Sequence, residues 1–139
     1  MRLLSLCLLL TASFLSSHEL QKFNLSLDFL EAGQSKEIEM DIKVPRNLYR
    51  PFLEETLNNG FNFDACNEIE FDLINSSLRY LTFKKKITCD NFPSLLEARN
   101  FFSLHPDQII LVNIKKETSL QNQTFLNNSK SKIDFKEAD

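Results

Sequence analysis

Two neighbouring segments near the start of the chain alternate between apolar and polar residues. They are FNLSLDF at 23–29 and KEIEMDIKV at 36–44, and both have the period of two that is typical of a half-buried β-strand. The residues between them, EAGQS at 31–35, suit a hairpin turn. The alternation gives each strand one apolar face, made of Phe23, Leu25, Leu27 and Phe29 on the first and Ile38, Met40, Ile42 and Val44 on the second. A chain with this hairpin must bury one face of a sheet against other elements.

A first helix and three further strands are predicted after the hairpin. The segment RPFLEETLNNG at 50–60 suits a helix that begins near Pro51 and ends at Gly60, where glycine tolerates the left-handed conformation of a helix terminus. The segments that follow are rich in β-branched and aromatic residues, with a turn expected at 75–77. The strands are expected at 61–66, 68–74 and 78–89.

A second helix and an apolar strand follow in the segment 91–117. Ser94 and Glu97 fit a capping box, which would start a helix over 94–104. Pro106 excludes His105 from the helical conformation and ends that helix. The run IILV at 109–112 then predicts a strand buried on both faces.

The two ends of the chain differ in character from the middle. Residues 1–17 combine a charged start, a short apolar run and a zone of small residues, as in a secretory signal peptide. Their apolar run is shorter than the roughly 20 residues that span a bilayer, so we expect a secreted, extracellular protein. Residues 18–117 are predicted to form a single globular domain. The polar residues 118–139 lack a sustained apolar period and are predicted to be a loosely ordered tail.

Cysteine usage agrees with export. Cys7 leaves with the signal peptide, and Cys66 and Cys89 can pair in an oxidising compartment. One disulfide would stabilise the fold by about 3 kcal/mol. The alternatives are two free thiols or an intermolecular pair. The cysteines and the two histidines have no metal-ligand spacing, so no metal site and no cofactor are expected.

Four Asn-X-Ser/Thr triplets are potential acceptors of N-linked glycans in an exported chain. They begin at Asn24, Asn75, Asn122 and Asn127. Such triplets also arise by chance in a sequence rich in Asn and Ser, and we expect two of the four to be used.

The charge pattern argues against nucleic acid as a partner. The formal net charge is −3, and the one cationic run, KKK at 84–86, is more typical of a solvated strand end than of a binding patch.

Two blocks of the sequence together resemble a known enzyme family. The blocks are LEETLNNGFNFDA at 53–65 and FPSLLEARNFFSLHPDQIILVNIKKE at 92–117. They are similar to the X-domain of phosphatidylinositol-specific phospholipase C, whose members have a block of the type QLNAGIRFFDIR, then a helix of the type FLKxNPxE, an apolar strand and often LKKE. The matching residues are 57–61 in the first block and Phe101, Phe102, His105, Pro106 and 109–117 in the second.

The resemblance implies a piece of a (β/α)-barrel, in which active members cleave phosphatidylinositol with two histidines as general base and general acid, helped by an Arg and an Asp. This chain departs from that pattern at the reactive positions. No histidine lies between Glu19 and His105, and Asn62 stands where the family has its Arg. Asp64 is the only acid at a family-like position, and a solvated or turn-capping Asp is the alternative interpretation. No catalytic residue is carried over to this chain.

The predicted fold class is α/β or α+β, with a small mixed sheet and two helices. A complete (β/α)-barrel needs about 250 residues, and this chain has 139. Two architectures remain open at this point. One is a partial barrel of the phospholipase C X-domain type, and the other is a compact α+β domain for which the resemblance is fortuitous.

Two functional hypotheses follow from these observations. The first is a secreted, disulfide-linked protein of phospholipase C-like ancestry that has lost hydrolysis and binds a phosphoinositide, a membrane surface or a partner. The second is an exported protein-recognition or effector module that is unrelated to phospholipases and binds an extracellular protein through its strand edges.

Overall fold

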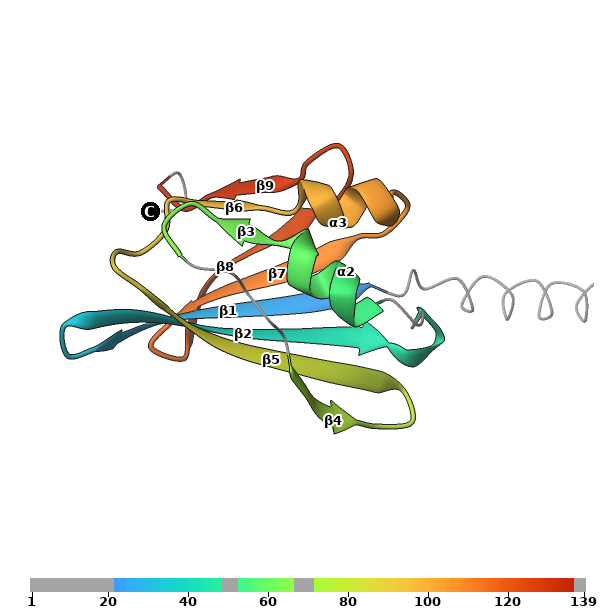
Figure 1. Ribbon diagram of the computed structural model, residues 1–139, viewed down its shortest axis with the longest axis horizontal. Helices are drawn as coiled ribbons and strands as arrows, with labels where there is room; N and C mark the ends of the chain where they lie inside the picture. Colours follow the sequence, from blue (N-terminus) through green and yellow to red (C-terminus); the bar gives the residue numbers. More distant parts are fainter. Residues whose placement is uncertain (1–21, 49–52, 67–71, 137–139) are drawn as a thin grey trace, which may run out of the picture.

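The protein has an α+β fold built from two sheets and two short α-helices (Figure 1). The computed structural model describes residues 22–48, 53–66 and 72–136. The strands of the larger sheet are β1 (Phe23–Ala32), β2 (Ser35–Pro45), β4 (Asp72–Ser76), β5 (Tyr80–Cys89), β7 (Ile110–Lys116) and β8 (Ser119–Leu126). The smaller sheet contains β3 (Asn62–Phe63), β6 (Leu95–Glu97) and β9 (Lys132–Asp134). The helices are the 3-10 turn η2 (Arg46–Leu48), α2 (Leu53–Gly60) and α3 (Arg99–Leu104).

The larger sheet has six strands in the order β4-β5-β2-β1-β7-β8. Neighbouring strands are antiparallel except for β1 and β7, which run parallel. The smaller sheet has the order β3-β6-β9 and is antiparallel. The large sheet is therefore mixed, and β4 and β8 are its two edge strands.

The predicted hairpin is confirmed. β1 and β2 pair in register from Asn24 opposite Lys43 to Ala32 opposite Ser35. The two-residue turn begins with Gly33, whose φ of 64° is a conformation that glycine adopts without steric penalty. The apolar residues of both strands lie on one face of the sheet, as the alternation predicts.

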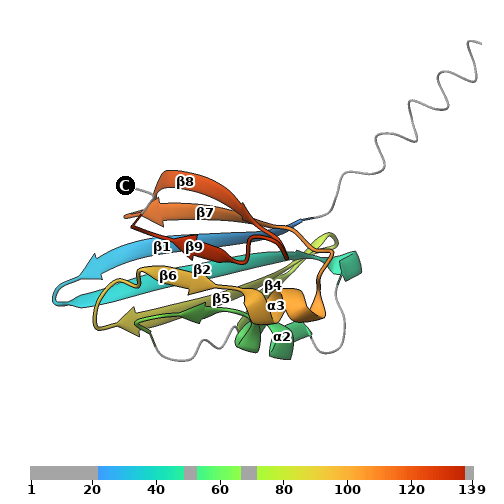
Figure 2. The same cartoon turned by 90° about the horizontal axis from the view of Figure 1, so that it is seen from above.

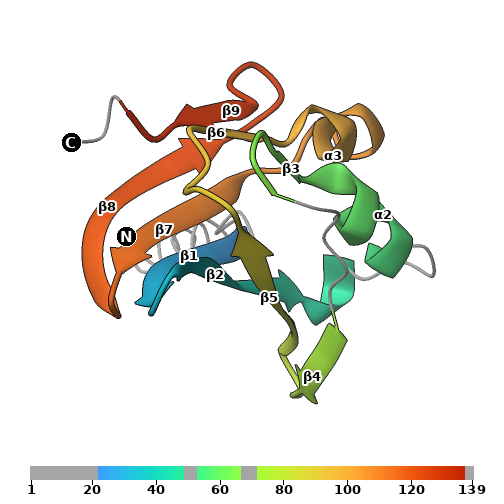
Figure 3. The same cartoon turned by 60° about the vertical axis from the view of Figure 1, so that its left-hand side comes forward.

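One face of the large sheet forms the hydrophobic core. The small sheet and both helices lie on this side of it, as Figure 3 shows. The buried residues of the large sheet are Phe23, Leu25 and Leu27 of β1, Ile38, Met40, Ile42 and Val44 of β2, Leu81, Phe83 and Ile87 of β5, Ile110, Val112 and Ile114 of β7, and Leu126 of β8. The other face carries mainly polar side chains, together with the paired Leu111 and Phe125 near one edge.

The two helices lie side by side at one end of the molecule (Figure 2). α2 contributes Leu53 and Leu57 to the core, and α3 contributes Phe101 and Phe102. A Cβ atom on Gly60 would lie only 3.0 Å from the Phe101 Cβ. Gly60 is thus needed for close helix packing, and the left-handed conformation predicted for it does not occur. The predicted role of Pro51 lies outside the described residues.

The predicted capping box at Ser94 and Glu97 is wrong. Residues 95–97 form the central strand β6 of the small sheet, and α3 begins only at Arg99, without a side-chain cap. The Ser94 hydroxyl and amide both donate to Asp64 instead. Strand pairing on both sides of β6 outweighs the local capping signal. The predicted end of the helix at His105 is confirmed.

Two further predictions about individual strands need correction. The run 109–112 is not buried on both faces, because β7 alternates between buried and half-buried residues and only one side of its sheet is covered. The predicted strand 61–66 is reduced to β3, and the turn expected at 75–77 lies later, because β4 extends to Ser76. Residues 67–71 of the predicted strand 68–74 lie outside the described residues.

The prediction of a loosely ordered tail over 118–139 is wrong for most of its length. β8 pairs with β7 along Ser119–Leu126, and β9 pairs with β6. β8 has little apolar character because it is an exposed edge strand, and its backbone hydrogen bonds hold it in place. Only Leu126 and Ile133 of these two strands are buried in the core.

The strand order gives no support to a barrel. The predicted strand after Gly60 and the strand at 110–116 belong to different sheets, whereas a (β/α)-barrel would place them in one parallel sheet. The coarser prediction of an α+β fold with a small mixed sheet and two helices is confirmed.

Candidate functional site

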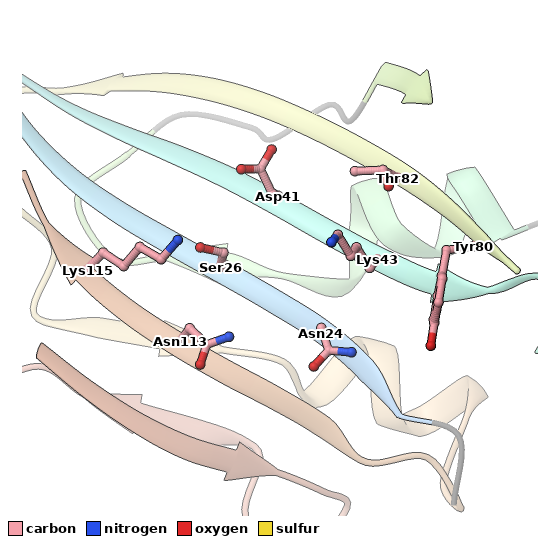
Figure 4. A pocket seen from close by; sticks show the side chains of 8 residues that line it. All are labelled: Asn24, Ser26, Asp41, Lys43, Tyr80, Thr82, Asn113 and Lys115. Atoms are coloured by element: carbon pink, nitrogen blue, oxygen red, sulfur yellow. The ribbon is translucent and has the colours of Figure 1, made fainter. Parts of the chain in front are cut away.

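The exposed face of the large sheet carries a cluster of polar side chains, shown in Figure 4. We call it the polar sheet pocket. It is an open pocket of about 590 Å³ on the central strands. It is lined by Asn24 and Ser26 of β1, Asp41 and Lys43 of β2, Tyr80 and Thr82 of β5, and Asn113 and Lys115 of β7.

The strand alternation places these side chains together. Asn24 and Ser26 lie between the buried residues of β1, so they point away from the core. Asn24 lies directly opposite Lys43 on β2, and Ser26 lies opposite Asn113 on β7. The pocket is therefore formed by side chains of four adjacent strands, β5, β2, β1 and β7, and by no irregular loop. A pocket built on regular strands is held rigidly by the sheet ladder.

Two lysines supply positive charge to the pocket. The side chains of Lys43 and Lys115 extend toward each other from β2 and β7, across β1 (Figure 4). Within the described residues no carboxylate lies within 4.0 Å of either ammonium group. Both amines are therefore available to an anion.

The other residues of the pocket provide hydrogen-bond donors and acceptors. Asp41 is contacted by Lys84 at 4.0 Å, a long ion pair that leaves its carboxylate able to accept further hydrogen bonds. The Asn113 Oδ1 accepts from Gln123 Nε2 at 2.6 Å, which leaves the Asn113 amide nitrogen as a donor. Tyr80 is 43% exposed and presents an aromatic ring at one end of the pocket.

A second, more apolar pocket lies at the end of the core between the two sheets. We call it the aromatic groove. Its volume is about 570 Å³. The rings of Phe92 and Phe135 pack edge-to-face on Phe29, with centroids 5.5 and 5.1 Å away. Ile114, Asn122 and Lys116 also line it. The three rings are only half-buried, so they form an apolar surface at the rim of the core.

Asp64 has a structural role, which was the alternative interpretation of this residue. Its Oδ1 accepts from the backbone amides of Ser94 at 2.9 Å and Leu95 at 3.1 Å, and its Oδ2 accepts from the Ser94 hydroxyl. The hydrogen bond from the Ser94 side chain, with the two amides, lowers the pKa of Asp64 below its ordinary value. Asp64 joins the turn after β3 to the start of β6.

Of the two histidines, only His105 lies in the part of the chain that the structure describes. His105 caps the end of α3, where its ring contacts Phe101 with centroids 5.0 Å apart. It does not line the polar sheet pocket. His18 lies outside the described residues. Among the residues that the structure describes, no group of three His, Cys, Asp or Glu side chains could hold a metal ion.

The predicted disulfide is present. Cys66 and Cys89 are joined, with Cα atoms 4.8 Å apart. Cys89 is the last residue of β5 and Cys66 follows β3, so the bond links the large sheet to the small one. It lies away from the polar sheet pocket and has a structural role.

The four predicted glycan acceptors lie in different settings. Asn24 is in the polar sheet pocket on the central strand β1. Asn75 and Asn122 are exposed residues of the edge strands β4 and β8. Asn127 is half-buried in the turn after β8.

Comparisons with known proteins give no relative from which to assign this site. No protein-family model matches the chain, and a search of curated proteins finds no match either. The predicted signal peptide lies within residues 1–21, outside the described ones. No helix in the described part of the chain is long and apolar enough to cross a membrane.

The polar sheet pocket was not predicted from the sequence. The signal that could have found it is the polar half of the alternation that defines β1 and β2, because Asn24, Ser26, Asp41 and Lys43 must share the face opposite the core. The position of Lys115 in the pocket could be found only from the parallel pairing of β1 with β7, which joins residues far apart in the chain. Asp64, the single family-like acid, lies elsewhere.

Proposed function

We propose that this chain is a secreted, non-catalytic binding protein whose polar sheet pocket takes a phosphorylated polyol of the inositol phosphate type. One observation carries the proposal: two lysines without a carboxylate partner in the described residues converge on a surface of amide, hydroxyl and carboxylate groups.

The chemistry of the pocket fits the two parts of such a ligand. A phosphate group binds lysine ammonium groups through charge-assisted hydrogen bonds, which Lys43 and Lys115 can donate from opposite sides. A polyol ring presents hydroxyls that both donate and accept. Asp41 can accept from them, while Ser26 and Thr82 can do either. The aromatic ring of Tyr80 can pack on the apolar edge of the ring.

The pocket is open, and this limits affinity. Charged contacts in an exposed site are weakened by solvent and by salt. Binding should therefore be reversible and should weaken as ionic strength rises. A free inositol phosphate and the headgroup of a phosphoinositide share the recognised chemistry.

The first test compares four probes by isothermal titration calorimetry and vesicle flotation. They are inositol monophosphate, inorganic phosphate, myo-inositol, and vesicles with and without phosphatidylinositol monophosphate. Tighter binding of inositol monophosphate than of phosphate or myo-inositol alone supports the proposal. Binding to phosphoinositide vesicles in addition identifies a lipid headgroup as a source. No binding of inositol monophosphate in any form would overturn the proposal.

The variant Lys43→Gln/Lys115→Gln tests the site itself. A hydrogen bond to a charged group contributes about 1.5–3 kcal/mol, so loss of both amines should weaken binding of inositol monophosphate at least about tenfold. The matched control is Lys86→Gln/Lys132→Gln, which changes net charge equally and touches no residue of the pocket. Equal loss in both variants would indicate nonspecific charge attraction and contradict the proposal.

Phospholipase C-like ancestry with lost hydrolysis is the finer part of the proposal, and it rests on the two sequence blocks alone. His105 lies at the end of α3 and does not line the polar sheet pocket. We therefore expect no release of inositol phosphate from phosphatidylinositol by the purified protein. Release that His105→Ala abolishes would refute the non-catalytic assignment.

A further inference from the structure

The two edges of the six-stranded sheet share an unusual set of features. β4 and β8 each have a neighbour on one side only. Both expose large apolar side chains: Leu73 and Ile74 on β4 are 49% and 56% exposed, and Leu120 and Phe125 on β8 are 54% and 49% exposed. An exposed apolar edge strand is a template for pairing with another chain.

β8 is the more vulnerable of the two edges. Its eight residues, SLQNQTFL, include no charged residue and no proline, which are the usual protections of an edge strand. Seven of its residues are described as exposed or half-buried, and Leu126 alone is buried. Some other feature must keep this edge from pairing.

Each edge strand has a bulge beside a glycan acceptor. In β4 the pairing with β5 shifts between Leu73 and Asn75. In β8 the pairing with β7 shifts between Asn122 and Leu120, so that Gln121 is the extra residue. Bulges at sheet edges direct side chains outward and interrupt pairing. Asn75, opposite Thr82, lies on the outer face of the sheet, whereas Asn122, opposite Ile114, lies on the core side. Both are exposed residues at irregular positions of the two edge strands.

We infer that export of the chain adds N-linked glycans to Asn75 and Asn122, and that these glycans cover the two free edges of the sheet. A glycan is bulky and strongly solvated, so it prevents a second strand from approaching. The Asn122 side chain also lines the aromatic groove, so its glycan would cover the half-exposed phenylalanine rings there.

The other two acceptors lie in unsuitable positions. Asn24 is on a central strand with β2 and β7 on its sides, inside the polar sheet pocket. Asn127 is half-buried, unlike the exposed Asn122, and its backbone exchanges two hydrogen bonds with Lys130 in a closed turn, at 3.0 and 3.1 Å. These two asparagines stay unmodified.

The covalent step is ordinary glycosyl transfer. The Asn Nδ2 loses one proton and forms a bond to the anomeric carbon of a lipid-diphosphate-linked oligosaccharide. The bond from that carbon to the diphosphate oxygen breaks, and the lipid diphosphate leaves. The donor belongs to the compartment through which the chain is exported.

Site occupancy is the first test. The full chain is expressed in cultured eukaryotic secretory cells, and peptide mass spectrometry measures each acceptor before and after enzymatic deglycosylation. We expect Asn75 and Asn122 to be occupied and Asn24 and Asn127 to be unmodified. Occupancy of Asn24 or Asn127, or an unmodified Asn75 or Asn122, would overturn the inference. This readout is independent of any ligand in the polar sheet pocket.

Self-association is the second test. Asn75→Gln/Asn122→Gln should sediment as a concentration-dependent mixture of monomers and larger species, whereas the wild-type protein and the control Asn24→Gln/Asn127→Gln stay monomeric. Circular dichroism of the dilute double variant verifies its fold. A folded Asn75→Gln/Asn122→Gln variant that stays monomeric at all concentrations would refute the role assigned to the glycans.

Discussion

Single residues in this protein are held by contacts that their neighbours in sequence do not reveal. Asp64 is exposed, yet its carboxylate accepts three hydrogen bonds from Ser94 and Leu95, across 30 and 31 residues of chain. The Ser94 hydroxyl, which a capping box would use for a helix, is taken by this interaction. A short polar side chain forms hydrogen bonds with any polar group that lies near it in the fold, so the tertiary structure determines its partners.

Asp64→Ala should therefore destabilise the fold although it removes no buried atom. Loss of a carboxylate that caps backbone amides lowers the free energy of unfolding by about 1–2 kcal/mol. Urea denaturation measures the change, and the exposed Asp107→Ala provides the control. A loss no greater than that of the control would contradict the assigned role.

The stabilisation by Asp64 also depends on pH. Because the folded-state pKa lies below its ordinary value of 3.8, the contribution is complete above that value and is lost as pH falls through the folded pKa. The stability difference between wild type and Asp64→Ala should narrow below about pH 4.

At the scale of elements, the sequence predicts those helices and strands that a local residue pattern determines. It does not predict strands that form only by pairing with segments far away in the chain. The β1–β2 hairpin follows from alternation and a glycine turn. β6 and β8 could not be predicted, because β6 forms between β3 and β9, and β8 is stabilised by backbone pairing to β7 with one buried side chain. The polar sheet pocket shares this limit, because Asn113 and Lys115 join it through the pairing of β1 with β7, and Tyr80 and Thr82 through the pairing of β2 with β5.

The turn between β7 and β8 shows how such an edge hairpin is fixed. Glu117 and Thr118 have φ values of 48° and 69°, which non-glycine residues rarely adopt. The backbone amide of Thr118 donates to the buried Asp28 at 3.0 Å, and that of Glu117 donates to the Phe29 carbonyl at 3.1 Å. The neighbouring strand β1 therefore holds a turn that the residues themselves disfavour.

Thr118→Gly should stabilise the protein. Glycine relieves the strain of a β-branched residue at positive φ and keeps the backbone hydrogen bond to Asp28, for a net gain of about 0.5–1 kcal/mol. Thr88→Gly, an exposed threonine within β5, should instead be destabilising. Chemical denaturation of both variants tests the argument, and a destabilised Thr118→Gly would show that the turn carries no strain.

At the scale of the whole molecule, the fold depends on the contacts that hold the small sheet on the core face of the large sheet. The smaller sheet has short strands and few hydrogen bonds of its own, so it depends on core contacts and on the covalent link to β5. The disulfide between Cys66 and Cys89 closes a segment with a sequence separation of 23. It thereby restricts the unfolded chain and fixes the start of the small sheet to the end of β5.

Cys66→Ala/Cys89→Ala should lower the free energy of unfolding by about 3 kcal/mol, because a loop of this length gains that much conformational freedom when it is opened. Reduction of the wild-type protein should give the same loss, since both treatments open one loop.

The polar sheet pocket lies on β1, β2, β5 and β7 and away from the disulfide bond. Binding of inositol monophosphate by the folded variant should therefore keep its wild-type affinity at low temperature. A variant that unfolds as late as the wild type would show that core contacts alone hold the small sheet, whereas one that folds but loses binding would show that the bond shapes the pocket.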